Sequence, residues 1–533
     1  MSRARRVARG IGLGLAALAV LALLLAGLLY LNRRAAAREL LTGWLERRGV
    51  PSEVEIERIE LDGLVARVRA GDPRDPDFAV ERVEVDYVIG APWSARGLGV
   101  TPSRVRLVRP VLKARWADGK LSLGALDPIV EEFTRRPPRP DSRSPLVLVE
   151  GGRVRLDTDY GRLAATADAR VDDGKLMRLD ARLPETRLQG RDGSARNLTG
   201  SATAATVGDR IRVRLDVAAD QATAPGLDLS GVAATLTGDL PYPDLKRRRG
   251  DGRAILSLKA AATTLGTGAT RLRGLAADGA FDGTVGGWIE AFRIAGRSDL
   301  NLRATDLDGA GARGAALNLA VAGGRLTLAR DENGLGWRLD GPTTVSAGRL
   351  AAGETTVEGL RLTSSALTVG GRGAAAEAVG PVTLGARRFR LGDLALNDVD
   401  GRAALDARFE GATLIQARGA LKAASGRWPL FGPTGRDDPA DLAAMKQALG
   451  DFRLSVPAFH LAIGSPGATV ALDRPVELRP DNGGVLRIAR MGARPVFAAR
   501  PGEAGGGAAV LTAERGRGLP ELAVDVPDWR LTP

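Results

Sequence analysis

The segment SRVRLVRPVLKARWADGKLSLG, residues 103–124, decides the expected fold. Valine and leucine alternate in it with arginine and lysine, which is the two-residue period of a half-buried β-strand. The alternation changes phase at Pro110, since the apolar places are 105 and 107 before it and 112, 114 and 116 after it. Because a one-residue shift moves every side chain to the other face, we expect a bulge or bend at this proline.

The same alternation recurs along the chain and predicts many strands, each with one apolar and one charged face. Val54 and Ile56 alternate with glutamates, and Val83 and Val85 alternate with Arg82, Glu84 and Asp86. The apolar positions of these first strands are the candidate lining of a groove: Val54, Ile56, Val83, Val85, Val105, Leu107, Leu112, Leu121 and Leu123.

Turn dipeptides indicate how the strands connect. The Asp-Gly pairs include those at 62–63, 118–119, 173–174, 192–193, 251–252, 278–279, 282–283, 308–309 and 400–401, and Asn-Gly occurs at 333–334 and 482–483. These pairs accept the positive φ of tight hairpins, so short strands in antiparallel meanders are expected. A parallel β-helix is the main alternative fold, and strand direction distinguishes the two.

Composition favours an open sheet over a sandwich. Aromatic residues make up 4% of the 533-residue chain, while small aliphatic residues are abundant. A packed sandwich core needs more large side chains. The pattern therefore predicts a long, twisted, curved sheet whose apolar face lines a groove filled by another molecule, while the charged face meets water. An ordinary core covered by a second sheet is the alternative for any single strand.

An N-terminal segment, Ile11 to Leu31, is uncharged and 21 residues long. A helix of this length spans a hydrocarbon core of about 30 Å and exceeds the apolar part of a cleaved signal peptide. It predicts a single-pass signal anchor. The flanking arginines favour a cytoplasmic N-terminus, with the body outside the cytoplasm.

Helix and linker signals divide the remainder. We expect residues 1–32 to hold the cytoplasmic tip and anchor, 33–50 an amphipathic helix, and 51–134 an N-terminal β module. A Pro/Arg-rich linker at 135–145 precedes a repeating β section at 146–424, an irregular hinge with a short helix at 425–450, and a final β section at 451–533 that continues in a longer chain or ends here. Asp127-Pro128 and Asp438-Pro439 each suit a helix start.

Several polar clusters have competing interpretations. The basic run Lys246, Arg247, Arg248 and Arg249 suits a headgroup or partner contact, or a solvated loop. Trp428 and its neighbours Leu430 and Phe431 suit insertion into a membrane, a plug at the end of a groove, or a packed hinge. The aspartates at 437, 438, 441 and 451 suit a cation site or a helix cap.

The residue types of the chain give little support for a catalytic function. The chain has no cysteine, and His460 is its one histidine, which fits a structural role. Thiolate metal sites and histidine-based acid–base chemistry are therefore disfavoured, and no cofactor is expected. The net charge is +13, but the arginines alternate along strands and no nucleic-acid-binding motif accompanies them, so we expect no nucleic-acid partner.

The N-terminal motifs resemble a known family. After the anchor come the turn LDGL (61–64), then FAVERVEVDYVIG (78–90), SRVRLVRPVLKARWADGKLSLGALDP (103–128) and VLVEGGRVRLDT (147–158). This series is similar to the AsmA-like superfamily of inner-membrane-anchored periplasmic proteins, and within it to the YdbH type. The motifs cover about residues 1–160, and the rest matches by composition and strand rhythm.

The resemblance implies a twisted, taco-like β-groove that carries phospholipids between inner and outer membranes. It implies the inner membrane and phospholipids as partners, with an outer-membrane protein or lipoprotein as a further partner, and it carries over no catalytic residue. Two other functions stay open from the residues: a scaffold for outer-membrane protein biogenesis, whose strand edges template client strands, and an enzyme, which no motif favours.

Overall fold

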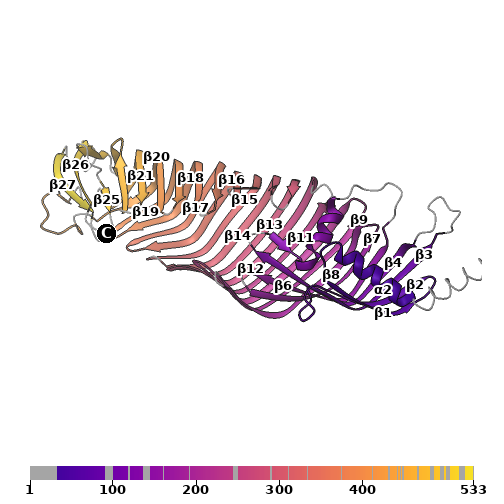
Figure 1. The fold of residues 1–533 in the computed structure, drawn as a ribbon. Helices are drawn as coiled ribbons and strands as arrows, with labels where there is room; N and C mark the ends of the chain where they lie inside the picture. Colours follow the sequence, from indigo (N-terminus) through magenta and orange to yellow (C-terminus); the bar gives the residue numbers. More distant parts are fainter. Residues whose placement is uncertain are drawn as a thin grey trace, which may run out of the picture. The chain divides into compact units, whose positions relative to one another are not determined.

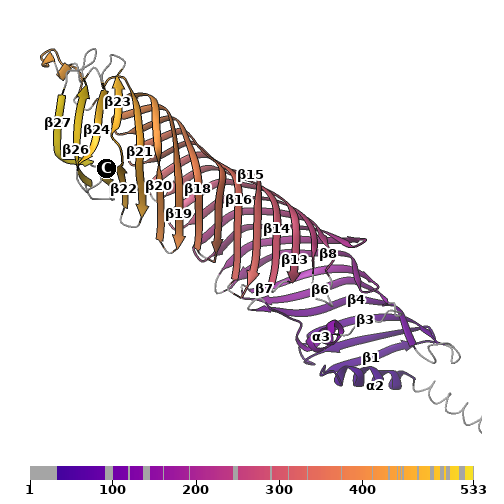
Figure 2. The same ribbon diagram turned by 90° about the horizontal axis from the view of Figure 1, so that it is seen from above.

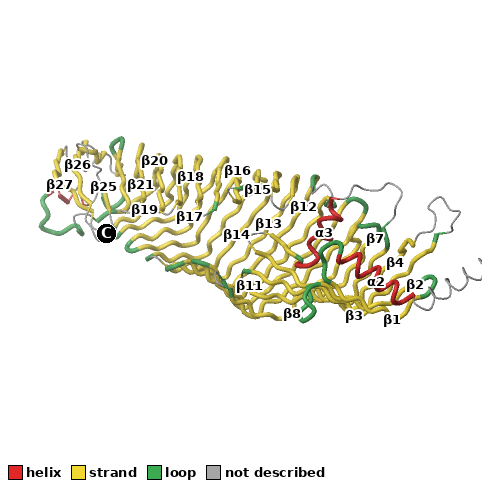
Figure 3. The backbone as a smooth tube through the Cα atoms, in the orientation of Figure 1, coloured by secondary structure: helices red, strands yellow, loops and turns green. Residues whose placement is uncertain are grey.

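The computed structural model describes residues 33–90, 100–117, 120–135, 144–159, 161–190, 193–243, 250–288, 291–309, 311–332, 334–373, 375–410, 412–429, 432–440, 442–443, 446, 449–464, 467–480, 485–491, 497–499, 505–514 and 522–531. The chain forms two compact units, and the boundary between them falls at Asp216, within a strand. Both units are mostly β, with a few short helices (Figure 3).

The first unit begins with a helix and continues as an open sheet. Its elements are α2 (Arg33–Glu46), β1 (Ser52–Ile59), β2 (Gly63–Ala70), β3 (Phe78–Ile89), β4 (Val100–Ala117), β5 (Lys120–Ser122), η1 (Gly124–Leu126), α3 (Asp127–Arg135), β6 (Leu146–Thr158), β7 (Gly161–Asp172), β8 (Lys175–Gln189), β9 (Ser194–Val207) and the start of β10 (Arg210–Ala224). Helix α2 lies beside β1 (Figure 2).

The second unit is a longer sheet of the same kind. Its strands are β11 (Leu227–Pro241), β12 (Gly252–Thr267), β13 (Thr270–Trp288), β14 (Ala291–Gly309), β15 (Ala312–Asp331), β16 (Gly334–Ala352), β17 (Thr355–Arg372), β18 (Ala375–Leu391), β19 (Leu394–Glu410), β20 (Ala412–Arg427), β21 (Phe452–Gly464), β22 (Gly467–Leu472), β23 (Val476–Pro480), β24 (Val485–Met491), β25 (Phe497–Ala499), β26 (Gly505–Glu514) and β27 (Leu522–Leu531). From β11 to β21 each strand pairs antiparallel with the next.

Strand direction decides against the parallel β-helix and confirms the antiparallel meander. One pairing differs from the expectation, because β4 and β6 run parallel. The chain crosses between them through β5, η1 and α3, as a parallel pair requires. The Asp77 carboxylate accepts a hydrogen bond from the Ala125 amide at 2.8 Å, and Arg48 Nη2 donates to Glu132 Oε1 at 3.1 Å. These contacts hold the crossover against the first strands.

The strands are longer than the turn dipeptides predicted. Asp173-Gly174 is a tight turn, with φ of 48° and 73°. In contrast, Asp278-Gly279 and Asp282-Gly283 lie inside β13, and Asp400-Gly401 lies inside β19, so those turn predictions are wrong. Asp282 bonds to Arg253 on β12, while a Cβ on Gly283 would lie 2.4 Å from the Ala295 carbonyl oxygen. Cross-strand pairing and close packing thus override the local turn preference.

A bend stands where the phase change predicted one. Arg109, directly before Pro110, has φ of 49°, and Gly151 on the parallel neighbour β6 has φ of 61°. A left-handed residue in a strand redirects the following side chains. This is why apolar positions 105 and 107 can share a face with 112 and 114.

The same device repeats through the second unit. Every second strand carries one left-handed residue near its start: Gly231 (φ 56°), Gly274 (58°), Ala316 (53°), Gly359 (63°) and Asp398 (48°). They recur at intervals of about 40 residues, the period of one β-hairpin. The ladder pairs residues on both sides of each one but not through it, for example Leu317 with Ala347 and Ala315 with Arg349 around Ala316.

These residues align across the sheet. The pairing registers place Thr305 between Gly274 and Ala316, and Gly348 between Ala316 and Gly359. The result is one continuous line of interrupted pairing, which we call the crease, running from Gly231 on β11 to Asp398 on β19. Figure 1 shows the strands of this unit bent partway along rather than straight. Sheets curve where such irregularities repeat in register.

The polar faces are held by ion pairs between neighbouring strands. In the first unit, Arg106 Nη2 lies 2.6 Å from Glu150 and Nη1 lies 3.2 Å from Glu84. Hydrogen bonds from Arg82 and Arg106 hold the pKa of Glu84 below its ordinary value, and Arg106 does the same for the pKa of Glu150. In the second unit, Arg253 lies 2.6 Å from Asp282.

The crease makes a stability prediction at Gly274. We expect Gly274→Ala to lower the free energy of unfolding by about 1–2 kcal/mol from the left-handed backbone alone. Steric repulsion adds to this, because the new Cβ would lie 2.6 Å from Thr305 Oγ1. Gly279→Ala is the control on the same strand, since its Cβ would meet nothing closer than 3.7 Å. Equal losses in urea unfolding of the two variants would contradict the role of the crease.

The Arg106 cluster makes a pH prediction. Because the pKa values of Glu84 and Glu150 are depressed in the folded state, their contribution is present at neutral pH and is lost as the pH falls below the ordinary glutamate value near 4.5. We expect Arg106→Ala to flatten the acid side of a stability-against-pH curve measured by thermal melting. Arg115→Ala, on the same strand, should leave that slope unchanged.

Candidate functional site

Two uninterrupted apolar rows cross the strands of the second unit. The first row joins directly paired residues: Leu229, Leu265, Leu272, Leu307, Gly314, Leu350, Val357, Phe389, Leu396, Gly426 and Phe452. The second row lies across the crease: Ala234, Ala260, Ala277, Leu302, Leu319, Val345, Leu362, Leu384, Gly401, Leu421 and Val456.

Both rows lie on one face of the sheet. Leu350 and Val345 are five residues apart, and a regular pleat would place them on opposite faces. Yet Leu396 and Phe389 of the first row pack in one cluster with Val456 and Leu384 of the second. The crease between the rows therefore reverses the alternation and merges two apolar stripes into one apolar face.

From β12 to β17 this apolar face is only partly buried. Leu258 and Leu302 are each 39% exposed. Leu272, Leu307, Leu319 and Val345 are half-buried. In these strands Phe281 and Val321 are the large apolar side chains that reach full burial among the described residues. Single-layer packing explains this, because a side chain on one sheet is covered only by its neighbours in that sheet.

From β18 to β21 the apolar face is more deeply buried, although Leu384, Phe389 and Leu421 of the two rows remain half-buried. Leu396 is 4% exposed, Val399 5%, Ala423 3% and Phe452 1%. Leu449, which lies in the connection between β20 and β21, packs on them and is 3% exposed. The apolar face thus has an uncovered section and a covered section within one unit.

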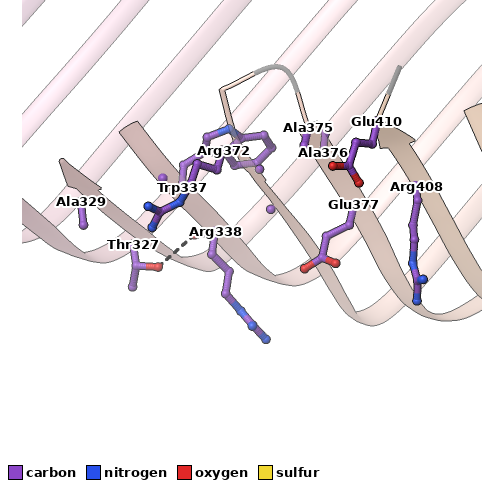
Figure 4. A pocket seen from close by; sticks show the side chains of 13 residues that line it. Thr327, Ala329, Trp337, Arg338, Arg372, Ala375, Ala376, Glu377, Arg408 and Glu410 are labelled. Atoms are coloured by element: carbon purple, nitrogen blue, oxygen red, sulfur yellow. Dashed lines mark hydrogen bonds between the residues drawn. The ribbon is translucent and has the colours of Figure 1, made fainter. Parts of the chain in front are cut away.

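One cavity lies away from these two rows. One of about 470 Å³ opens at the ends of β15–β19, beside Trp337, Arg372 and Glu410 (Figure 4). Arg338, Glu377 and Arg408 line it, and they belong to one row of the sheet, in which Gly370 separates Arg338 from Glu377. Their charges are matched within the sheet, since Arg338 lies 3.0 Å from Asp340 and Arg408 lies 3.2 Å from Asp406. This hollow therefore combines charged side chains of the rim with the apolar side chain of Trp337, and it lies at the strand ends beyond the two rows named above.

The described residues were also compared with the requirements of a metal site. Within the described ranges, no group of three or more histidine, cysteine, aspartate or glutamate side chains could hold a metal ion. Asp438, one of the aspartates with a cation-site interpretation, instead pairs with Lys446 at 2.9 Å. His460 Nδ1 lies 2.7 Å from Asp473 Oδ2.

The groove-lining candidates of the first unit fall in similar rows. Ile56, Val83 and Leu107 belong to one row that continues through Ala66, Val149, Ala169, Leu179 and Ala204. Val85 pairs with Val105 in the adjacent row, and Leu112 pairs with Phe78 and Val154. Val54 is 4% exposed, whereas Ile56, Val83, Val85, Val105, Leu107 and Leu112 are half-buried.

The remaining candidates are placed differently. Leu121 lies on the short strand β5 and is 56% exposed, and Leu123 directly precedes η1 and is half-buried. Residues 246–249, with Lys246, Arg247, Arg248 and Arg249, lie outside the described residues, as does the anchor Ile11 to Leu31. None of the helices in the described part of the chain has both the length and the apolar character needed to cross a membrane.

The sequence analysis did not identify the individual residues that form the apolar rows of the second unit. Their signal is an apolar residue two places before a left-handed position and another directly after it, as in Leu272-Arg273-Gly274-Leu275 and Val357-Glu358-Gly359-Leu360. The motif recurs once per hairpin. It is hard to see in the sequence because the special residue is Ala316 or Asp398 in two of the repeats.

Comparison with known proteins agrees with this architecture. Neither a search of curated proteins nor a search of solved structures found a significant match. A family model described as YdbH-like, intermembrane phospholipid transport protein YdbH, matches residues 20–471. That range includes all described elements of the first unit and the second unit through β21. The chain therefore belongs to the YdbH-like family of intermembrane phospholipid transport proteins.

Proposed function

We propose that this protein carries phospholipid acyl chains along its apolar face between the inner and outer membranes. The observation that supports this most strongly is the uncovered section of β12–β17, where two apolar rows run across strand after strand without a polar interruption. Acyl chains lying in the bent sheet would complete the burial that a single layer leaves unfinished. The bent, open sheet is the groove in this proposal.

Binding of this kind is nondirectional. Each buried methylene group contributes about 0.8 kcal/mol, whatever its position along the rows. Because leucine, valine and alanine repeat from strand to strand, a chain shifted by one strand meets nearly the same surface. A lipid can then slide along the rows with small barriers, and the net direction is set by the membranes at the two ends.

The setting of this activity is also a proposal. Ile11 to Leu31 is the single-pass inner-membrane anchor, with the N-terminus in the cytoplasm and the body in the periplasm. Lys246, Arg247, Arg248 and Arg249 suit an anionic headgroup or a protein partner, and an outer-membrane protein or lipoprotein would receive the lipid. The family match supports transport rather than the scaffold or the enzyme, because the matched family is a transport family.

A charge placed in the rows tests the carriage of lipid. Leu319 lies in the second row between Leu302 and Val345, and it is half-buried. We expect Leu319→Glu to fold normally, because its carboxylate reaches water when no lipid is bound, and to reduce bound phospholipid at least severalfold. An unpaired carboxylate against acyl chains costs several kcal/mol. Phospholipid extracted from the purified full chain and counted by mass spectrometry measures the effect.

The matched control is Asn318→Asp. It introduces the same sign of charge one residue away, on the polar face beside Ser346. Phospholipid content equal to that of the unsubstituted chain is expected for it. If Leu319→Glu also retained its phospholipid while circular dichroism showed a folded sheet, the apolar rows would not be the lipid path.

The absence of cysteine allows a direct test of orientation. The chain has none, so a single introduced thiol is unique. We expect Leu335→Cys, at a position that is 45% exposed, to react with a membrane-impermeant maleimide in spheroplasts. Ser2→Cys should react only after the membrane is permeabilised. The reverse pattern would place the body in the cytoplasm.

A further inference from the structure

We propose that the covered section of the apolar face, β18–β21, is a further acyl-chain site, and that the chain's own β20–β21 connection occupies it in the structure. This inference rests on the proposed function and adds to it a defined site with a built-in competitor for lipid. The connection runs from Trp428 to Asp451, whereas the neighbouring hairpins turn within a few residues.

Continuity of the rows is the first step. Leu350 and Val357 lie in the uncovered section, and Phe389 and Leu396 follow them directly in the same row. The second row likewise passes from Leu362 to Leu384 and on to Leu421. Nothing in the residue types of these rows changes at β18, so a lipid lying along them meets the same apolar chemistry on both sides of that point.

The covering group is the second step. Leu449 packs into the cluster formed by Leu396, Val399 and Ala423, and Trp428 packs against the same cluster. The Trp428 amide donates a hydrogen bond to the Leu449 carbonyl at 2.9 Å, which closes the base of the connection. Leu449 and Trp428 of this connection therefore contribute to the burial of the covered section, together with Val476 and Leu478 of β23, which belong to the same cluster.

The way in which the connection is held is the third step. Lys446 Nζ lies 2.9 Å from Asp438 Oδ2 and also donates to the Pro433 carbonyl at 3.1 Å. The Gly435 amide donates to Asp438 Oδ2 at 2.7 Å. The Lys446 and Asp438 side chains are only 10% and 15% exposed. These polar contacts join parts of the connection to one another, while Leu449 holds it to the sheet by apolar contact.

Another apolar group can replace Leu449 in a contact of this kind. Leu449 offers a four-carbon side chain to a surface that has no directional requirement, and about four methylene groups of an acyl chain bury a similar area. A lipid advancing along the rows can thus take the place of Leu449, whose docked position the Asp438–Lys446 pair supports by ordering the connection. The connection then limits entry of lipid into β18–β21 until an acyl chain displaces it.

Site-specific photocrosslinking in the full chain tests the site. p-Azidophenylalanine replaces Phe389 in the covered section, or Trp337, which pairs with Leu328 on the uncovered section. Both are aromatic positions, so the substitution changes little. Cells grown with ³²P-phosphate are irradiated, and phospholipid adducts on the purified chain are counted in three further backgrounds: Leu449→Ala, Asp438→Asn and Leu414→Ala.

The expected result is an adduct at position 337 in every background and a weak adduct at position 389 in the unsubstituted chain. Leu449→Ala removes the competing side chain, and Asp438→Asn weakens the internal ion pair, so each should raise the adduct at 389 at least about threefold. The control Leu414→Ala removes a leucine of β20 that is 41% exposed and pairs with Arg408 on the polar face. It should change neither adduct.

Two outcomes overturn the proposal and are distinct from each other. An adduct at 337 with none at 389 in any background, or one at 389 that the substitutions do not change, rejects the covered site and leaves the proposed function intact. No adduct at either position rejects the proposed function together with the site. Circular dichroism of each variant separates these results from misfolding, and Asp438→Asn keeps the test informative if Leu449→Ala fails to fold.

Discussion

The left-handed residue on every second strand is the constraint on which the rest of the second unit depends. A flat pleated strand places residues an odd number apart on opposite faces, so the two leucine-rich stripes would face opposite sides. The crease reverses the alternation and brings Leu350 and Val345 to one side. It also bends the strands at the same place in each hairpin. The left-handed residues therefore both curve the sheet and make one of its faces apolar.

The crease requires a positive φ rather than one residue type, so different residues occupy it. Glycine takes a positive φ without strain, and it stands there in three of the five strands. Ala316 and Asp398 take the same conformation in the other two, at a cost that a well-paired ladder on both sides can offset.

A single-layer sheet leaves the side chains of its apolar face partly exposed to solvent. In most proteins a second sheet or a helix layer covers such a face. Here Leu258 and Leu302 stay 39% exposed, while a few strands away Leu396 is 4% exposed beneath Leu449. An exposed apolar surface of this extent marks a binding surface. The charged face stays soluble because its arginines and aspartates neutralise each other across strands, as Arg253 and Asp282 do.

The sequence by itself determined the fold class, the antiparallel direction and the bend at Pro110, because two-residue periodicity and turn chemistry are local properties. It also named Ile56, Val83 and Leu107 as apolar positions of separate strands, and the pairing registers place them in one row. Only the tertiary structure decided where the long strands end, because Asp278-Gly279 and Asp400-Gly401 carry turn signals that pairing with neighbours overrides. The parallel β4–β6 pair, the alignment of the crease and the cover provided by Leu449 likewise depend on contacts between residues far apart in the chain, which no local pattern contains.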